Sequence, residues 1–229
     1  MVVDITRYTR DFPSLRFQAY DQGILELIIA NERQRNAATE AMHRDLAMVW
    51  RTVDVDDAVR VVVVRGEGNH FSAGGEFSMI DNMINDEATF AADNARILDG
   101  HTRLGVAAGD HAVIIWPLLC GLAKARYHLL TNKPLSGAEA ERIGLFAMAV
   151  PDDAVIDNAF EVARTLAASS ATATRWTKHA LNNWLRLAGL SFDTSLALEF
   201  LGFRLRDARE GMAAMREKRP PSFEDKKVE

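Results

Sequence analysis

Residues 59–75 read VRVVVVRGEGNHFSAGG, an apolar run that passes directly into a turn rich in small residues. A run of valines without polar alternation is typical of a strand that is buried on both faces. The turn does not match the dinucleotide-binding motif G-x-G-x-x-G, because Phe71 stands where the third glycine is required. A turn of small residues between a strand and a helix instead presents free backbone N–H groups, which can hold an oxyanion.

The residues before this stretch predict an α/β arrangement. Residues 15–30 alternate apolar and polar side chains around Asp21-Gln22-Gly23, the pattern of two strands joined at a turn. Residues 39–53 predict a helix that begins after a Thr39 cap. Its apolar face would consist of Met42, Leu46, Val49 and Trp50.

The residues after position 136 favour helices. Ser136 with Glu139 three places later forms the pattern of a capping box, and Gly144 is a stop signal. We therefore divide the chain into a core of residues 1–165 and a helical C-terminal region of residues 166–229.

Composition excludes several classes of function. The 229 residues carry a net charge of −5, so a broad basic surface for nucleic acid is not expected. The single cysteine, Cys120, cannot form an intramolecular disulfide and lies in an apolar run, which fits a small buried side chain in the reducing cytoplasm. No signal peptide and no uninterrupted apolar run of membrane-spanning length is present, so we expect no membrane partner.

Residues 59–80 closely resemble the first signature of the crotonase superfamily, also called the enoyl-CoA hydratase/isomerase family. Three further motifs extend the resemblance in the same order: TNKPLSGAEAERIGL (131–145), RWTKHALN (175–182) and DAREGMAAMREKRPPSF (207–223). The resemblance implies a crotonase-like spiral of repeated ββα units with a helical C-terminal region. It also implies an acyl-CoA substrate, with coenzyme A as part of the substrate and no tightly bound cofactor.

In the resembled family, the thioester carbonyl lies between two backbone N–H donors. Matching the motif makes the N–H of Ala73 the first donor, with Gly74 and Gly75 beginning the following helix. The second donor comes from a later glycine-rich turn, and the segment that should carry it is missing near residues 87–88. One alternative is that the folded protein really lacks this segment, which would leave the neighbouring strands unpaired. The other is that the protein has the segment and that its residues were left out of the sequence.

The stretch 99–111, DGHTRLGVAAGDH, lies where hydratases of the family carry a glutamate. His101 stands near that position, so a two-glutamate hydratase mechanism is not implied. The loop is more similar to the carbon-carbon bond hydrolase branch, of the 6-oxocamphor hydrolase type, in which a histidine is followed by a Gly-Asp pair. We therefore predict His101 as a general acid or base and Asp110 as its partner or as an independent acid.

The resemblance also implies sites for coenzyme A and for assembly. Arg33 and Arg35 match the adenine- and phosphate-binding loop, and Lys218 matches a basic residue contributed by a neighbouring subunit. The helical C-terminal region resembles the family's trimerisation region, so a homotrimer or a dimer of trimers is expected.

Other interpretations of these residues stay open. His101 can serve as a turn cap and Asp110 as a helix cap, the three basic residues as solvated charges, and the glycine turn as a turn without a ligand. For the whole protein, the alternatives are a hydrolase of 1,3-dicarbonyl compounds and a non-catalytic acyl-CoA binder. No metal-binding motif is present, so no metal is expected.

Overall fold

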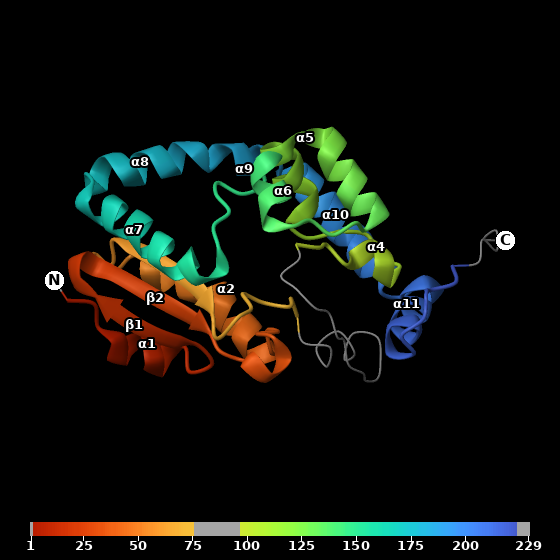
Figure 1. Ribbon diagram of the computed structural model, residues 1–229, viewed down its shortest axis with the longest axis horizontal. Helices are drawn as coiled ribbons and strands as arrows, with labels where there is room; N and C mark the ends of the chain where they lie inside the picture. The colour runs from red at the N-terminus through yellow and green to blue at the C-terminus, as the bar shows by residue number, and fades with distance from the viewer. Residues whose placement is uncertain (1, 76–96, 224–229) are drawn as a thin grey trace. The chain divides into compact units, whose positions relative to one another are not determined.

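The structure is a computed structural model in which residues 2–75 and 97–223 are described. Figure 1 labels its helices and strands. The junction of residues 87 and 88, where the resemblance implies that a segment is missing, lies outside the described residues.

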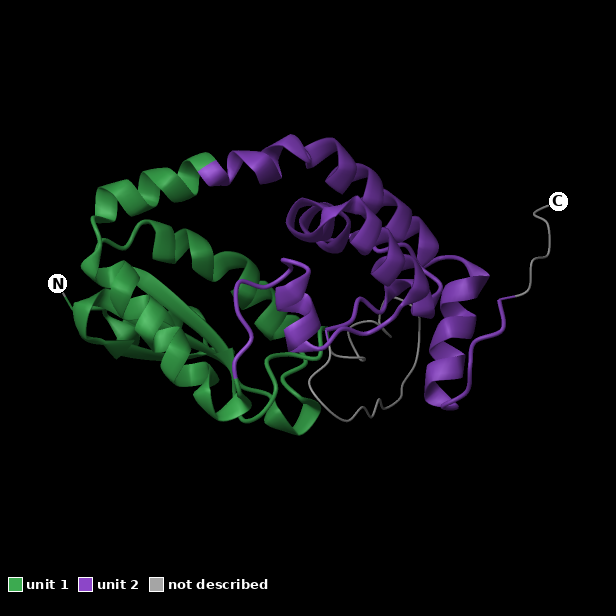
Figure 2. Cartoon of the chain, turned by 45° about the horizontal axis from the view of Figure 1, so that its top comes forward, with its two compact units in different colours: residues 1–80, 151–180 green, residues 81–150, 181–229 purple. Residues whose placement is uncertain are grey.

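The chain folds into two compact units that interleave along the sequence (Figure 2). Unit 1 comprises residues 1–80 and 151–180, and unit 2 comprises residues 81–150 and 181–229. The division at 165/166 that the sequence predicts rests on an expected role in assembly, and it stays a prediction.

Unit 1 is built on a three-stranded sheet with the order β1-β2-β3. Strands β1 (Arg16–Tyr20) and β2 (Ile24–Ile29) form the predicted antiparallel hairpin around the turn η1 (Asp21–Gly23). Gly23 has a φ of +75°, and a Cβ at this position would lie 2.5 Å from a backbone oxygen, so the turn requires glycine. Strand β3 (Val61–Gly66) pairs with β2 in parallel, and the helix α2 (Glu40–Asp54) forms the crossover.

Helices cover both faces of this sheet (Figure 1). Leu25, Leu27 and Ile29 of β2 pack with α1 (Ile5–Asp11) and α2 in one core cluster. Ile24 and Val63 pack on the opposite face against α7 (Val155–Ala168). Unit 1 also contains the short turns η2 (Glu32–Gln34) and η3 (Asp152–Ala154), and α7 is followed by α8 (Ala171–Leu181).

Helix α2 confirms the predicted cap but not the whole predicted face. The Thr39 hydroxyl accepts a hydrogen bond from the Met42 N–H at 3.2 Å, as expected of an N-cap. Trp50, in contrast, is 43% exposed, whereas Asp45 is buried. The Asp45 carboxylate is satisfied there because both the N–H and the hydroxyl of Ser14 donate to it.

Strand β3 is less buried than its run of valines predicts. Val63 and Gly66 are buried, and the other four residues are half-buried. Within the part of the chain that the structure describes, β2 is the single neighbour of β3, so one edge of the strand lacks the cover expected of a central strand.

Unit 2 is helical in its described residues. It contains α4 (His101–Leu104), α5 (Ala112–Thr131), α6 (Gly137–Arg142), α9 (Asn183–Leu187), α10 (Gly189–Gly202) and α11 (Arg206–Arg216). Its core cluster includes Ala112, Trp116, Ala125 and Leu129 of α5, together with Leu135, Ala140 and Leu145. The predicted Ser136 cap is confirmed, since its hydroxyl accepts from the Glu139 N–H at 3.2 Å. The Glu139 carboxylate pairs with Arg142 and does not complete a capping box.

Helix α5 is the one described helix long and apolar enough to cross a membrane. It is interrupted at Gly121, which has φ 77° and ψ 155°, and it carries Pro117 in its interior. It also contains Lys124 and Arg126 and contributes four residues to the core of unit 2. Helix α5 therefore buries one face in unit 2 and exposes large apolar side chains elsewhere, among them Leu122 and Leu130.

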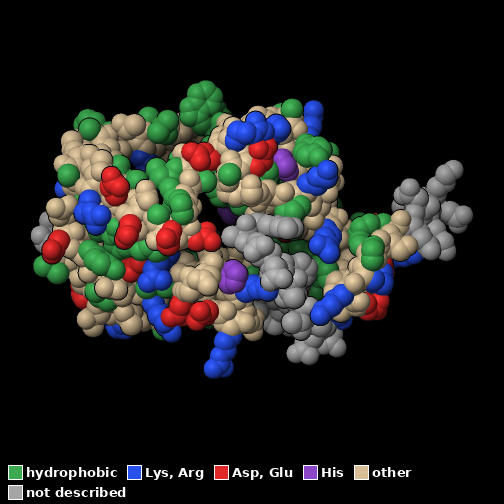
Figure 3. Space-filling model, in the orientation of Figure 1, with side chains coloured by type: hydrophobic (Ala, Val, Ile, Leu, Met, Phe, Trp, Pro, Cys, Tyr) green, Lys and Arg blue, Asp and Glu red, His purple; other side chains and the backbone are tan. Residues whose placement is uncertain are grey.

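The surface combines scattered charge with exposed apolar side chains. Acidic and basic residues are interspersed on the face shown in Figure 3. Helices α9 and α10 expose several large apolar residues, including Leu187 (78%), Leu190 (85%) and Leu201 (63%).

Candidate active site

The glycine turn after β3 lies against the loop that follows β2. The Ala38 N–H donates to the Gly74 carbonyl at 2.8 Å, and Ala38 forms a parallel bridge with Gly75. The Gly74 N–H donates to the Ser72 hydroxyl at 3.1 Å, and Gly74 has a φ of +92°, a conformation suited to glycine. The helix predicted to continue from Gly75 lies outside the described residues.

Ala73 is exposed in this turn. No acceptor for its N–H is found within residues 2–75 and 97–223, whereas the next N–H, that of Gly74, is bound to Ser72. The Ala73 N–H thus has no acceptor among the described residues, and its role as the first oxyanion donor stays a prediction.

The predicted coenzyme A residues lie in different places. Arg33 is exposed within η2, and Arg35 is half-buried directly after it with a φ of +52°. Lys218 is exposed just beyond the end of α11 and also has a positive φ, 53°. Arg33 and Arg35 belong to unit 1 and Lys218 to unit 2, and their roles stay predictions.

His101 begins the short helix α4, and each nitrogen of its ring faces a carboxylate. Nδ1 lies 3.1 Å and 3.2 Å from the two carboxylate oxygens of Asp99. Nε2 lies 3.3 Å from Oε1 of Glu199, which comes from α10. The His101 side chain is 23% exposed, and those of Asp99 and Glu199 are 8% and 12% exposed, so this triad is largely shielded from solvent.

The two carboxylates favour the protonated ring. The hydrogen bond that the His101 ring donates to Asp99 is the largest cause, followed by the one that it donates to Glu199, and together they raise the pKa of His101 from 6.5 to about 10. Burial opposes this shift, because it disfavours the charged form, and the negative charge of Asp110 adds to it. His101 is therefore an imidazolium at neutral pH, which can donate a proton.

Asp110 makes no hydrogen bond to His101 among the described residues. Its Oδ1 accepts from the Ala112 N–H at 3.2 Å, so the carboxylate caps the first turn of α5. It nevertheless lies near the imidazole, since ligand atoms of Asp99, His101 and Asp110 come within 4.8 Å of one another. Asp110 thus serves as the helix cap, one of the predicted possibilities, while its role as a partner of His101 or as an independent acid stays a prediction.

Asp99, His101 and Asp110 lie close enough to bind one cation, but the hydrogen bonds of His101 favour a proton on its ring instead. A histidine binds a metal through a neutral ring nitrogen. Both ring nitrogens of His101 already face carboxylates, in an arrangement that stabilises the imidazolium. The expectation that the site holds no metal stays a prediction.

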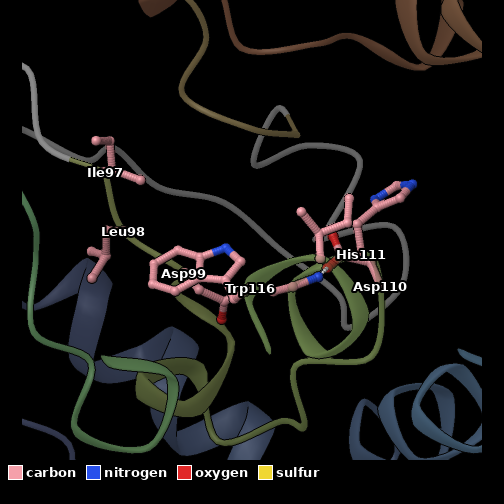
Figure 4. A pocket seen from close by; sticks show the side chains of 8 residues that line it. Ile97, Leu98, Asp99, Asp110, His111 and Trp116 are labelled. Carbon is pink, nitrogen blue, oxygen red and sulfur yellow. Dashed lines mark hydrogen bonds between the residues drawn. The ribbon is translucent and has the colours of Figure 1, made fainter. Parts of the chain in front are cut away.

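An open hollow of about 260 Å³ is lined by Asp99, which is also a partner of His101. Figure 4 shows the side chains that line it. Asp99 and Asp110 are its acidic lining residues, and its apolar lining consists of Ile97, Leu98, Ala112, Ile115 and Trp116. Figure 4 shows Ile97 and Leu98 on one side of Trp116 and Asp110 and His111 on the other. Apolar walls with a few charged groups are typical of small-molecule sites.

Two residues of this site, Asp99 and Glu199, are missing from the sequence-based predictions. Asp99 could have been found, because an acidic residue two places before a histidine can reach its ring. Glu199 gives no local signal, since only the fold brings α10 to α4. Its place is fixed by close packing around Gly109, where a Cβ would lie 2.2 Å from Cβ of Glu199, and by the Ser195 hydroxyl, which donates to the Gly109 carbonyl at 2.8 Å.

Comparison with known proteins shows the fold class. A carnitinyl-CoA hydratase from Mycobacterium avium has a similar structure with a TM-score of 0.80 at 18% identity, covering 92% of this chain and 98% of that one. A beta-diketone hydrolase from the cyanobacterium Anabaena is similar with a TM-score of 0.75 at 24% identity, covering 86% and 96%. The predicted crotonase-type α/β fold is therefore confirmed.

Sequence relatives define the family. A probable enoyl-CoA hydratase of Mycobacterium bovis is 33% identical over 175 residues, which are 72% of this chain and 63% of the relative, so the chain spans less than two thirds of that protein's length. Residues 82–226 match the sequence profile of the enoyl-CoA hydratase/isomerase family. The chain belongs to the enoyl-CoA hydratase/isomerase family.

Proposed function

We propose that the protein is an acyl-CoA enzyme that stabilises a thioester enolate, with the Ala73 N–H as the first oxyanion donor and His101 as the proton-transfer group. The observation that carries this proposal is the placement of His101 between Asp99 and Glu199 beside an apolar hollow. The accessible Ala73 N–H and membership of the family support it. In this function coenzyme A is part of the substrate, held by Arg33 and Arg35 together with Lys218 of a neighbouring subunit, and no other cofactor is needed.

The two carboxylates that face its ring nitrogens support a role for His101 as a general acid, since they stabilise the protonated imidazole. In an isomerisation, a carboxylate lining the hollow, Asp99 or Asp110, would take a proton from the substrate carbon. In a hydration, the same carboxylate would take a proton from the water that adds to the β-carbon. Either step leaves an enolate whose negative charge lies on the thioester oxygen, and the α-carbon of the enolate later takes up a proton. An imidazolium can supply that proton, and the carboxylates then stabilise its return to the charged form. Removing one oxyanion donor in comparable sites costs about 3 to 4 kcal/mol of transition-state stabilisation.

The second candidate function is hydrolysis of a carbon-carbon bond in a 1,3-dicarbonyl compound. The observation that favours it is the cluster of three carboxylates, those of Asp99, Asp110 and Glu199, around His101. The resemblance of this loop to the carbon-carbon bond hydrolase branch supports it. Water would add to one carbonyl carbon, the bond to the central carbon would break with its electron pair forming an enolate, and the enolate would take up a proton. This reaction needs no coenzyme A.

The experiment offers the purified protein crotonyl-CoA, butyryl-CoA in D2O and cyclohexane-1,3-dione. Hydration of the first, or exchange of the α-protons of the second, supports the acyl-CoA function, whereas ring opening of the dione supports the hydrolase. His101→Gln is expected to lower the observed rate at least about 100-fold. Retention on CoA-agarose without any turnover would instead identify a non-catalytic acyl-CoA binder.

We also propose a homotrimer or a dimer of trimers in the cytoplasm. The exposed apolar residues of α9 and α10 support assembly, because large apolar patches on a monomer commonly mark an interface. Light scattering that shows a stable monomer would refute it.

A further inference from the structure

Asn36 is a fully buried residue in the loop that follows β2, and this loop lies against the glycine turn. Its relative exposure is 0%, and its φ of +58° places it in the left-handed region, which asparagine adopts more readily than most residues other than glycine. A buried polar side chain is tolerated where hydrogen bonds satisfy it, so the partners of Asn36 define its role.

The Asn36 side chain is fully engaged across two loops. Its Oδ1 accepts from the Asn31 N–H at 3.0 Å, within its own loop. Its Nδ2 donates to the carbonyls of Glu67 and His70, at 2.8 Å and 2.6 Å, in the turn that follows β3. Gly66 makes this approach possible, because a Cβ there would lie 1.9 Å from the His70 carbonyl oxygen and 2.5 Å from Nδ2.

A second set of hydrogen bonds extends from the Asn36 backbone to both sides of Ala73. The Ser72 hydroxyl donates to the Asn36 carbonyl at 2.9 Å and accepts from the Gly74 N–H at 3.1 Å. Asn36 therefore fixes the start of the turn through its side chain and the residues flanking Ala73 through its carbonyl.

We infer that Asn36 is a positioning residue for the oxyanion donor, the Ala73 N–H. Ser72 links the two, because its hydroxyl binds both the Asn36 carbonyl and the Gly74 N–H and so fixes the residues on either side of Ala73. The inference rests on the proposed function of the Ala73 N–H. A backbone donor stabilises an enolate only when it is fixed in the productive direction, and a small misplacement can cost about 100-fold in rate. Asn36 touches no reacting atom, so its loss should lower the rate of enolate formation more than the affinity for coenzyme A.

The test measures exchange of the α-protons of butyryl-CoA in D2O by NMR. In this exchange the α C–H bond breaks, its proton passes to a carboxylate lining the hollow, Asp99 or Asp110, and its electron pair forms the enolate. A deuteron from solvent then forms the new α C–D bond. Asn36→Asp keeps the size of the side chain but its carboxylate cannot donate to the Glu67 and His70 carbonyls. We expect Asn36→Asp and Ser72→Ala each to slow exchange by at least about 10-fold, with the Kd of free CoA within about 2-fold of that of the unchanged protein.

Asn158→Ala is the matched control in the same unit. It removes an amide that donates to the Ala154 carbonyl at 2.9 Å in α7, away from the turn. We expect it to leave the exchange rate unchanged, with all rates measured well below the unfolding temperature of each variant. Ser72 is exposed, so Ser72→Ala retains the test if Asn36→Asp does not fold.

Two failures are distinguishable. Exchange at the wild-type rate in Ser72→Ala and in folded Asn36→Asp overturns the positioning role while the proposed function stands. An unchanged protein that neither exchanges butyryl-CoA nor binds CoA refutes the proposed function, and the inference falls with it.

Discussion

Oε1 of Glu199 lies 3.3 Å from Nε2 of His101, on the side of the ring opposite Asp99. The relationship joins α10 to α4 within unit 2 and surrounds one imidazole with two carboxylates. An imidazole between two anions holds its proton more tightly in the folded protein than in the unfolded chain. This difference has consequences for stability, for titration and for metal binding.

The stability of the protein should fall as pH rises from about 6.5 to about 10. The folded-state pKa of His101 is raised from 6.5 to about 10, so the stabilising protonation is complete below pH 6.5 and is lost as pH passes through the folded value. We expect the free energy of unfolding, measured by chemical denaturation at several pH values, to fall over this range in both proteins. The fall should be about 2 to 4 kcal/mol smaller in His101→Gln than in the unchanged protein. Parallel pH profiles for the two proteins would contradict the prediction.

Removing either carboxylate should lower the pKa of His101, and Asp99→Asn should lower it more than Glu199→Gln. Asp99 is the larger cause of the raised pKa, and its contact is the shorter one. NMR titration of the His101 ring should show a decrease of about 1 to 2 pKa units for each variant. Glu139→Gln, which pairs with Arg142 on α6, is the control and should leave the titration of His101 unchanged. The reverse order of the two effects would show that Glu199 dominates.

Chelation with EDTA should leave turnover unchanged. The ligand atoms of Asp99, His101 and Asp110 come within 4.8 Å of one another, but a cation would have to displace a proton that the carboxylates stabilise. The measurement is the rate of α-proton exchange or dione cleavage before and after dialysis against EDTA. Loss of activity that a single divalent ion restores would show that these three residues bind a metal.

Sequence reasoning predicted the local features of the fold because they depend on neighbouring residues. The hairpin around residues 21–23 and the caps at Thr39 and Ser136 follow from turn and capping chemistry, and they are confirmed. The exposure of Trp50 could not be predicted, because a helical period does not show that Ser14 will satisfy a buried Asp45.

The candidate site was predicted only in part, for the same reason. His101 and Asp110 lie in one short stretch whose similarity to a family marks it, and Asp99 lies two residues away. Glu199 belongs to a helix far along the chain, and no spacing relates it to His101. The same holds for Asn36, whose partners Glu67 and His70 become neighbours only when β3 pairs with β2.

Gly211→Ala should destabilise the packing of α11 on α4, the short helix that begins at His101, because the two helices lie in close contact at this position. A Cβ on Gly211 would lie 2.2 Å from the Leu104 carbonyl oxygen and 2.5 Å from its carbonyl carbon, so backbone atoms would have to shift. Denaturant unfolding should show that the free energy of unfolding falls by about 1 to 3 kcal/mol, the range for overpacking.

Gly189→Ala is the matched control, since Gly189 lies in α10 with nothing within 4 Å of the added Cβ. It should instead stabilise the protein by about 0.4 to 1 kcal/mol, because alanine reduces the entropy of the unfolded chain. Equal effects of the two substitutions would show that α11 does not depend on this contact.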